Sequence, residues 1–349
     1  NALTKLEAGE SWALKPEMLD DNPYIWTPGI KWDVRPGTYT HKIEFFGPLL
    51  GVICAENLDH ALKIVNDTGY GLTSGIETLD KREQEIWKDK IEAGNLYINR
   101  GTTGAVVLRQ PFGGMKKSAL GAGIKAGGPN YISQFMNIKD KSEPSVGAIK
   151  GDYSLLRLVK AWRIELLYGK FPKNQSENKD DIKKFIRAVK SYIFWAEQEF
   201  FKEKDYFNLR GQDNIVRYLP VKDMLIRLHE KDTLFDTLAR IAAAKIAGTK
   251  PVISMPKELD NEIVKFLYTE KGKQVLSDTL IIKESDKALT AALLKYDRIR
   301  YAAPDRVPEI IYKKAAETGA YISRTKPVME GRIELIQYFK EQSICCNYH

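Results

Sequence analysis

The stretch DMLIRLHEKDTLFDTLARIAAAKIAGTKPVIS, residues 223–254, holds the alternation that decides the fold. The apolar run at 223–228 predicts a buried strand. Apolar residues at helical spacing over 234–247, closed by Gly248, predict a helix. A second apolar run follows at 251–254. A strand, a helix and a strand of these lengths predict a parallel β-α-β unit.

The same alternation continues further along the chain. We expect a helix at 259–269, a strand at 280–282, a helix at 287–295, a strand at 299–302, a helix at 308–318, a strand at 321–323 and a helix at 332–340. Repeated units of this length imply a parallel sheet covered on both faces. We therefore expect an α/β fold with a Rossmann-like, doubly wound domain over residues 217–349.

The upstream sequence has a different character. Residues 139–216 predict a helical connector, with a polar linker before the helices at 155–168 and 182–202. Residues 1–138 are rich in glycine and turn signals. Within them we expect strands at 24–34 and 42–54 joined by a tight turn, helices at 57–66 and 79–93 with Asn57 and Gly94 as caps, and a strand at 95–99.

Composition narrows the class of protein. The chain has 349 residues, 43% hydrophobic and 29% charged, as in folded proteins of about two domains. No uncharged apolar stretch approaches the ~20 residues of a membrane span. Three cysteines without a signal segment indicate a reducing, cytoplasmic location. Because the sequence starts with Asn1, we expect it to be an internal part of a longer chain.

The net charge of +8 raises the question whether the protein binds nucleic acid. Acids and bases are interspersed, as in DKREQEIWKDK (residues 80–90), and no basic stripe with interleaved aromatics occurs. A solvated surface is the better interpretation, and a nucleic-acid module ranks last.

Three possible sites can be set aside. The four scattered histidines (His41, His60, His229 and His349) do not have metal-ligand spacing, so we expect no metal. Residues 121–126, GAGIKA, fit a G-x-G-x-x-A fingerprint, but Gly127, Gly128 and Pro129 would break the helix it needs. Cys54 lies in the apolar strand expected at 42–54, so we expect a buried structural thiol.

Other motifs are more particular. They are EFFGP (44–48), NDTGYGLTSGI (66–76), GNLYINRGTTGAVVLRQPFGG (94–114) and GGPNYI (127–132). In this order they resemble the C-terminal half of the catalytic domain of aldehyde dehydrogenases. They are most similar to the L-glutamate γ-semialdehyde (pyrroline-5-carboxylate) dehydrogenases, in particular the module of the bifunctional bacterial proline utilization A enzymes. Residues 211–220 and 329–349 extend the resemblance.

This resemblance implies a cofactor and a substrate. The cofactor would be NAD, with Glu44 bonding the nicotinamide ribose and Phe46 packing near the nicotinamide. The substrate would be glutamate semialdehyde, its α-carboxylate held by the backbone N–H groups of Gly104 and Ala105. Phe112 would pack against its aliphatic chain. A carboxylate can accept hydrogen bonds from both hydroxyls of a ribose diol, and consecutive backbone N–H groups can bind an anion.

The resemblance also implies that some of the enzyme's functional parts lie outside this segment. The family's nucleophilic cysteine and general-base glutamate lie upstream of these motifs, so we expect no catalytic residue in this segment. A flavin-dependent proline dehydrogenase, with FAD, would precede it, and the whole would form a homo-oligomer. Residues 242–258 resemble a cofactor-binding segment of the family, but Met255 stands where the family has a lysine. Methionine cannot donate a hydrogen bond, so we expect a degenerate, non-catalytic cofactor fold.

Two functions therefore compete. The chain supplies part of a dehydrogenase site, or it is a structural module that promotes oligomerisation and seals a tunnel between active sites. One chain could do both.

Overall fold

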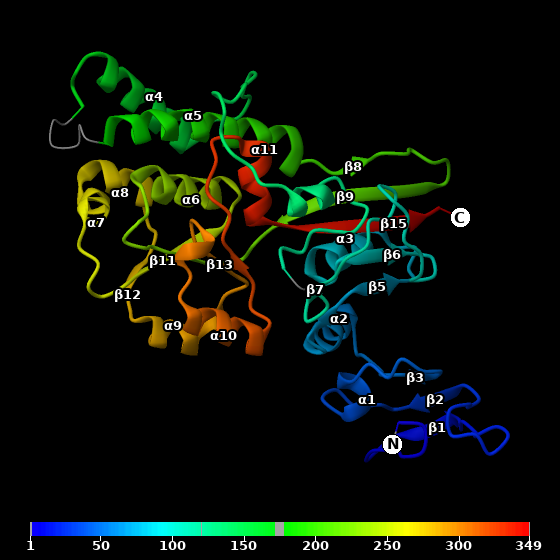
Figure 1. The fold of residues 1–349 in the computed structure, drawn as a ribbon. Coiled ribbons are helices and arrows are strands. Elements are labelled where there is room, and N and C mark those ends of the chain that lie inside the picture. The colour runs from blue at the N-terminus through cyan, green and yellow to red at the C-terminus, as the bar shows by residue number, and fades with distance from the viewer. Residues whose placement is uncertain (1, 120, 172–177, 349) are drawn as a thin grey trace.

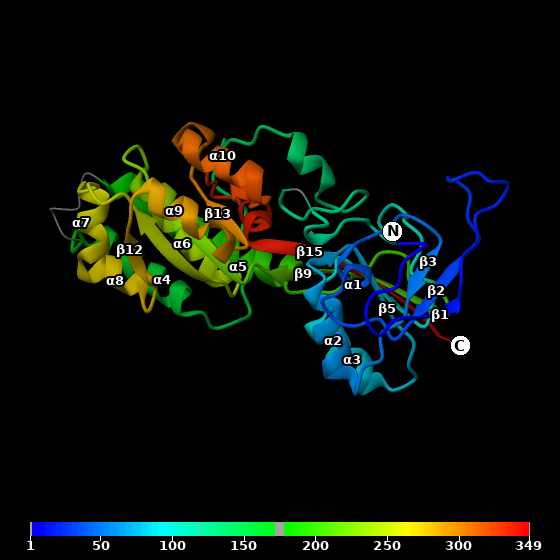
Figure 2. The same cartoon turned by 90° about the horizontal axis from the view of Figure 1, so that it is seen from below.

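The computed structural model describes residues 2–119, 121–171 and 178–348. Figure 1 shows a helix-covered parallel sheet beside a second, mixed sheet, with a three-stranded sheet at the N-terminal end; Figure 2 shows the same bodies from below. Among the residues described, no helix combines the length and the apolarity that crossing a membrane requires.

The parallel sheet confirms the expected Rossmann-like fold. Its spatial order is β12-β11-β10-β13-β14, with every neighbouring pair parallel. The strands are β10 (Asp223–Arg227), β11 (Lys250–Met255), β12 (Ile281–Lys283), β13 (Arg298–Arg300) and β14 (Ile322–Ser323). The chain winds outward from β10 to one edge and then returns to its other side, which is the doubly wound order.

Both faces of this sheet are covered. Met224 and Ile226 of β10 pack into one buried cluster, whereas Leu225 between them packs into another. The first face carries α6 (Leu234–Ile246), α7 (Glu262–Tyr268) and α8 (Glu270–Leu276), and the second carries α9 (Asp286–Ala292) and α10 (Glu309–Thr318). Short 3-10 turns follow α9 at Leu293–Lys295 and precede α10 at Pro304–Arg306. Residues at the centres of the strands are apolar because both faces of the sheet are buried, whereas the arginines Arg227, Arg298 and Arg300 lie at strand ends.

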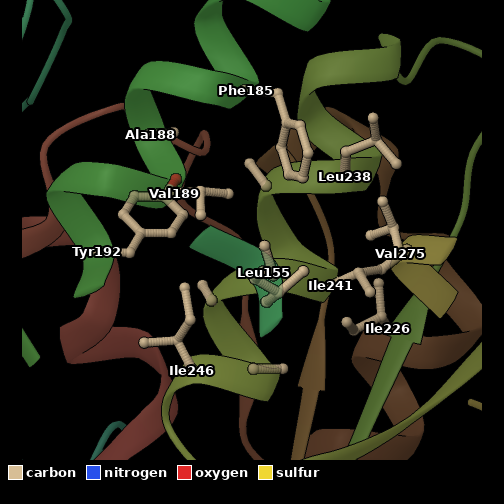
Figure 3. Packing of buried hydrophobic residues seen from close by; sticks show 14 of the residues in the cluster. Leu155, Phe185, Ala188, Val189, Tyr192, Ile226, Leu238, Ile241, Ile246 and Val275 are labelled. Carbon is tan, nitrogen blue, oxygen red and sulfur yellow. The ribbon is translucent and has the colours of Figure 1, made fainter. Parts of the chain in front are cut away.

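Two further helices form an outer layer over α6. They are α4 (Ser154–Leu167) and α5 (Lys179–Trp195), and a π-helical turn, Ala196–Phe200, continues α5. Figure 3 shows Phe185 of α5 beside Leu238 of α6 in the largest buried cluster. The helices expected in the connector are thus confirmed.

The mixed sheet corrects the expected helix at 332–340. Only α11 (Gly331–Glu334) and a 3-10 turn (Leu335–Tyr338) are helical, and the chain then enters a nine-residue strand. The sheet order is β5-β6-β15-β9-β8, for β5 (Thr73–Ile76), β6 (Asn95–Ile98), β15 (Phe339–Asn347), β9 (Gln212–Pro220) and β8 (Lys204–Asp205). Pairing with strands on both sides overrides the helical periodicity of the sequence.

This sheet joins distant parts of the chain. β15 runs parallel to β6 and antiparallel to β9. The sheet therefore contains strands from each of the segments 1–138, 139–216 and 217–349. Those segments remain a prediction as domains, and the structure adds that they share one sheet.

The N-terminal region differs from the expected hairpin. β1 (Ser11–Leu14) pairs antiparallel with β2 (Gly29–Trp32), but β2 pairs parallel with β3 (Leu49–Gly51). A short helix, α1 (Tyr39–Lys42), lies in the connection. Parallel neighbours need a crossover and cannot be joined by a tight turn.

The helices of this region are mostly as expected. Asn57 caps α2 (Leu58–Asp67) through a bond from the His60 N–H. However, α3 (Lys81–Lys90) ends at Ile91, so Gly94 is not its cap. Two short strands, β4 (Tyr70–Gly71) and β7 (Met115–Lys116), pair antiparallel with each other. The 3-10 turn Tyr131–Phe135 completes the region.

Candidate functional site

Glu44 and Phe46 lie in the connection between α1 and β3. The Glu44 side chain is exposed and lines a cavity of about 480 Å³, together with residues of α1, α2 and β5. No hydrogen bond joins its carboxylate to any residue that the structure describes. Phe46 is 92% exposed and has a φ of +50°, an uncommon conformation for a residue with a side chain. Both side chains are thus free of the fold and available to a ligand.

Gly104 and Ala105 lie in the exposed loop after β6, residues 99–110, which we call the anchor loop. Gly104 has a φ of +114°, which glycine adopts without strain. Its carbonyl oxygen accepts a hydrogen bond from the Tyr97 hydroxyl at 2.9 Å. The preceding carbonyl, of Thr103, accepts from Arg100 Nη2 at 3.4 Å.

These bonds orient two peptide planes. The peptide bonds are trans, so each N–H points opposite to the carbonyl that precedes it. With the carbonyls of Thr103 and Gly104 tied to the protein, the N–H groups of Gly104 and Ala105 point away from it. Neither N–H donates to an acceptor among the described residues. Two adjacent free amides are suited to holding a carboxylate.

The anchor loop is in turn tied to the C-terminal strand. Arg100 lies over the Tyr97 ring, and its Nη1 donates to Cys345 Sγ of β15 at 2.7 Å. The Cys345 thiol donates to Asn214 of β9 at 3.3 Å. Gln110 accepts from Arg100 at 2.7 Å and donates to the Gly104 carbonyl at 3.3 Å in the amide orientation that satisfies both groups. No pattern in the sequence indicated that Cys345 would contact this loop.

Phe112 lies just beyond the anchor loop. Residues 106 and 110 pair across a tight hairpin, and Phe112 then pairs with Ala126 through two backbone bonds of 2.9 and 3.0 Å. Gly104 therefore lies two residues before this hairpin, and Phe112 lies two residues after it. The Phe112 side chain is half-buried, so part of the ring is open to a partner.

A buried polar clamp holds the backbone on either side of Phe112. Asn95 donates to the Pro111 carbonyl at 3.0 Å and accepts from the Gly113 N–H at 3.1 Å. The ammonium of Lys125 donates to Asn95 Oδ1 at 2.9 Å and to the Gly113 carbonyl at 2.5 Å. Ser343 of β15 also donates to the Pro111 carbonyl. The backbone around Phe112 is therefore held by two strands, β6 and β15, and by Lys125 from a loop.

Lys125 connects this clamp to Glu341. Desolvation lowers the pKa of Lys125 to about 7, although Glu341 opposes that shift. Burial raises the pKa of Glu341, whose carboxylate accepts from the Lys125 backbone N–H at 2.7 Å and from Asn130 at 2.6 Å. Neither side chain was singled out from the sequence, where Lys125 was only part of the GAGIKA pattern.

The structure supports setting that pattern aside. Gly121 and Gly123 have positive φ, and the next helical element, the 3-10 turn Tyr131–Phe135, begins only after Gly127, Gly128 and Pro129. Cys54, however, was predicted wrongly: its thiol is exposed, because the strand ends at Gly51. In the part of the chain that the structure describes, no three His, Cys, Asp or Glu side chains are grouped to hold a metal ion.

The parallel sheet has its own crevice at the carboxyl ends of β10, β11 and β13, where doubly wound folds bind ligands. Here the N-terminus of α6 is satisfied by the chain itself. Asp236 N–H donates to Thr233, Thr233 N–H to Asp236, and Phe235 N–H to Asp181. Arg306 closes over the same end of the helix, paired with Asp232 and Asp236. These contacts occupy the N–H groups of Phe235 and Asp236 and place carboxylates at this end of the helix, which does not suit a pyrophosphate.

Met255 ends β11 beside this crevice and is fully buried. Its side chain packs in the core of the sheet. The expectation that this domain is a degenerate cofactor fold stays a prediction.

Comparisons with known proteins fit this arrangement. Residues 4–141 match the aldehyde dehydrogenase family model. The chain is 41% identical over 124 residues to 1-pyrroline-5-carboxylate dehydrogenase of Bacillus subtilis, covering 36% of this chain and 24% of that protein. The chain thus spans about a quarter of the length of the curated relatives it matches.

Two solved structures are also similar. Proline utilization A from Corynebacterium freiburgense is 34% identical with a TM-score of 0.74, covering all of this chain and 30% of that one. A 1-pyrroline-5-carboxylate dehydrogenase from Thermus with bound NAD is 37% identical over 35% of this chain and 23% of that one, with a TM-score of 0.34. The resemblance expected from the motifs is confirmed.

Proposed function

We propose that this chain, whose residues 4–141 carry the signature of the aldehyde dehydrogenase family, forms part of an NAD-dependent L-glutamate γ-semialdehyde dehydrogenase. The observation that carries the proposal is the pair of outward-facing amides at Gly104 and Ala105. Relatives named 1-pyrroline-5-carboxylate dehydrogenase support the substrate class. The nucleophilic cysteine and the general base would come from a longer protein that includes this segment.

The roles of this chain's residues follow from their geometry. The amides of Gly104 and Ala105 would hold the α-carboxylate, and the half-buried ring of Phe112 would cover the aliphatic chain. Together they would hold the substrate so that the aldehyde at its other end is oriented for the reaction. A substrate without the α-carboxylate would lose this anchor.

The cofactor site is proposed on the same terms. The exposed, unpartnered Glu44 carboxylate beside a cavity fits a ribose diol, which offers two O–H donors. The exposed Phe46 ring would pack near the nicotinamide. When bound, NAD supplies a hydride acceptor for the aldehyde.

The wider context is also a proposal. Likeness to proline utilization A over the whole chain supports a bifunctional protein in which a flavin-dependent proline dehydrogenase, carrying FAD, supplies the semialdehyde. We place this protein in the cytoplasm as a homo-oligomer. Its cysteines are free thiols, as a reducing compartment favours.

The substrate role can be tested in the full-length protein with Gly104→Ala. A Cβ at Gly104 would lie 3.1 Å from the Gln110 side chain, in a backbone conformation that alanine rarely adopts. We expect the KM for glutamate semialdehyde to rise at least tenfold, while kcat/KM for propanal changes less than twofold. Gly101→Ala is the matched control, because nothing lies within 4 Å of its Cβ. Equal losses for both aldehydes would contradict the anchor role.

The cofactor role has a separate test. Glu44→Gln should weaken NAD binding in the full-length protein, measured by titration, because an amide accepts fewer bonds from the diol than a carboxylate. Glu56→Gln, at another exposed position, should leave the affinity unchanged. Unchanged affinity in both variants would remove Glu44 from the cofactor site.

A second function, structural support and tunnel sealing, is favoured for the doubly wound domain. This proposal is supported by the N-terminus of α6, where the N–H groups of Phe235 and Asp236 are occupied by side chains and the carboxylates of Asp232 and Asp236 would repel a phosphate. We expect one NAD per protomer in the full-length protein, and only that one site, with weakened affinity, in Glu44→Gln. A second, Glu44-independent NAD site would contradict this role.

A further inference from the structure

A large cavity lies away from the site described above. It has a volume of about 780 Å³ and lies between α4, α5 and the linker residues 143–149. This volume is typical of sites for small molecules, which measure roughly 300–1,000 Å³. Figure 1 shows α4 and α5 along one side of the molecule, far from β1–β3. The proposed dehydrogenase chemistry does not use this cavity.

The rim of the cavity is strongly cationic. α4 contributes Lys160 and Arg163, one turn apart on one helix face, and α5 contributes Lys183, Arg187 and Lys190 at the same periodicity. Like charges at this spacing repel each other along a helix. The cluster therefore carries an electrostatic cost that the fold alone does not require.

Acidic side chains compensate only part of this charge. Arg187 is paired with Glu143 at 2.6 Å, and Lys183 is paired with Asp180 at 3.1 Å. Lys160, Arg163 and Lys190 have no acidic partner within 4 Å among the described residues. Desolvation lowers the pKa of Lys190, and the charges of Arg163 and Lys160 lower it further. An anion bound here would relieve this repulsion.

The floor of the cavity is apolar. Val146 and Ile149 line it from the linker, Leu156 and Leu166 from α4, and Ile186 from α5. A small inorganic anion would use the rim and leave this floor uncovered. A ligand with an anionic head and an aliphatic body would satisfy both parts.

We propose that this cavity binds a single anionic amphiphile, a long-chain carboxylate or alkyl phosphate, with its head on the Arg163–Lys190 rim and its tail on the apolar floor. The concave shape favours a monomeric ligand over a flat protein or membrane surface, because protein interfaces commonly bury about 800 Å² on each partner. The proposal does not depend on the dehydrogenase function.

Calorimetric titration of the full-length protein with dodecanoate, below its micelle concentration, tests the proposal. We expect one site per protomer, binding dodecanoate at least tenfold more tightly than dodecanol, which lacks the charge, or acetate, which lacks the tail. Dodecyl phosphate should compete with dodecanoate for the same site. Equal binding of dodecanoate and dodecanol would overturn the proposal.

Variants locate the site. Arg163→Glu combined with Lys190→Glu should weaken dodecanoate binding at least tenfold, with an unchanged circular dichroism spectrum. Val146→Ser, on the linker, should weaken dodecanoate more than octanoate, because the longer tail covers more floor. Lys257→Glu with Lys287→Glu, both exposed in the doubly wound domain and not among the residues that line this cavity, is the matched control. Full binding in the Arg163/Lys190 variant, or binding of anionic phosphatidylglycerol vesicles without monomer binding, would overturn the proposal.

Discussion

The hydroxyl of Tyr97 donates to the carbonyl oxygen of Gly104 at 2.9 Å and thereby fixes the direction of the next amide, that of Ala105. Tyr97 is almost completely buried in β6, whereas Gly104 lies in the exposed anchor loop. A rigid strand thus sets the geometry of an otherwise exposed segment.

Tyr97→Phe removes this bond and keeps the ring. A lost hydrogen bond of this kind costs about 1 kcal/mol, or roughly a fivefold change in an equilibrium. We expect the KM for glutamate semialdehyde to rise about fivefold in the full-length protein, with the Kd for NAD unchanged. Tyr131→Phe, at an exposed tyrosine outside the anchor loop, is the control. A parallel loss of NAD affinity would argue against a role confined to the anchor loop.

Phe112→Ala should weaken use of the semialdehyde more than it weakens NAD binding. Removing a large aromatic from a packed site costs roughly 3–5 kcal/mol in a core, and we expect less at this half-buried position. Steady-state kinetics with both substrates varied, alongside NAD titration, separates the effects. If the losses for substrate and cofactor are equal, Phe112 does not line the aldehyde site.

Gly94→Ala should disturb the Phe112 segment through the backbone. A Cβ at Gly94 would lie 1.9 Å from the Gly113 carbonyl oxygen and 3.0 Å from the Gly114 Cα, so the backbone itself would have to move. We expect a lower urea midpoint of unfolding and a raised KM for the semialdehyde. Gly101→Ala, with open space at its Cβ, should change neither quantity. An unchanged Gly94→Ala protein would contradict this packing.

The Lys125 clamp predicts a dependence of stability on pH. The pKa of Lys125 is lowered to about 7 in the fold from an ordinary value near 10.5. Between these values the unfolded chain binds more protons, so stability rises as pH rises through this window. From pH 7 to 9 the gain in the free energy of unfolding is about 2 kcal/mol. Glu341, whose pKa is raised, acts oppositely in a window that opens above its ordinary value of 4.5.

Urea titrations at pH 7, 8 and 9 measure this gain as the difference between the wild type and Lys125→Met. The stability of the wild type should increase relative to that of the variant across the series. Lys273→Met, at an exposed lysine, should follow the wild type. A constant difference between wild type and Lys125→Met would mean that Lys125 does not titrate in this range.

Local patterns were sufficient for most of the doubly wound domain. Alternation of apolar runs and helical spacing predicted β10, α6 and β11 to within about two residues. The same reasoning failed near the C-terminal end, where a helix was predicted at 332–340 but only short helical turns form and the strand β15 begins at Phe339. The neighbours of that segment, β6 and β9, are far away in sequence, and no local pattern contains their hydrogen bonds.

The candidate site divides in the same way. Glu44, Phe46, Gly104, Ala105 and Phe112 were named from motifs, and their roles remain predictions. Arg100, Cys345 and the Asn95–Lys125 clamp were missed, because their partners come from other strands. Cys54 was predicted to be buried because the apolar pattern extends to it. The strand itself ends earlier, at Gly51, and Cys54 is exposed.

The position of β15 constrains how the protein can be made. β6 pairs with β5 on one side, but its other edge is filled only by residues 343–346 of β15. At about 5–20 residues per second, a ribosome needs roughly 12–50 s to proceed from β6 to β15. During that interval the nascent chain presents an open, apolar strand edge, which is a template for pairing with other chains. We expect synthesis of this protein to depend on chaperones that shield that edge until the final strand emerges.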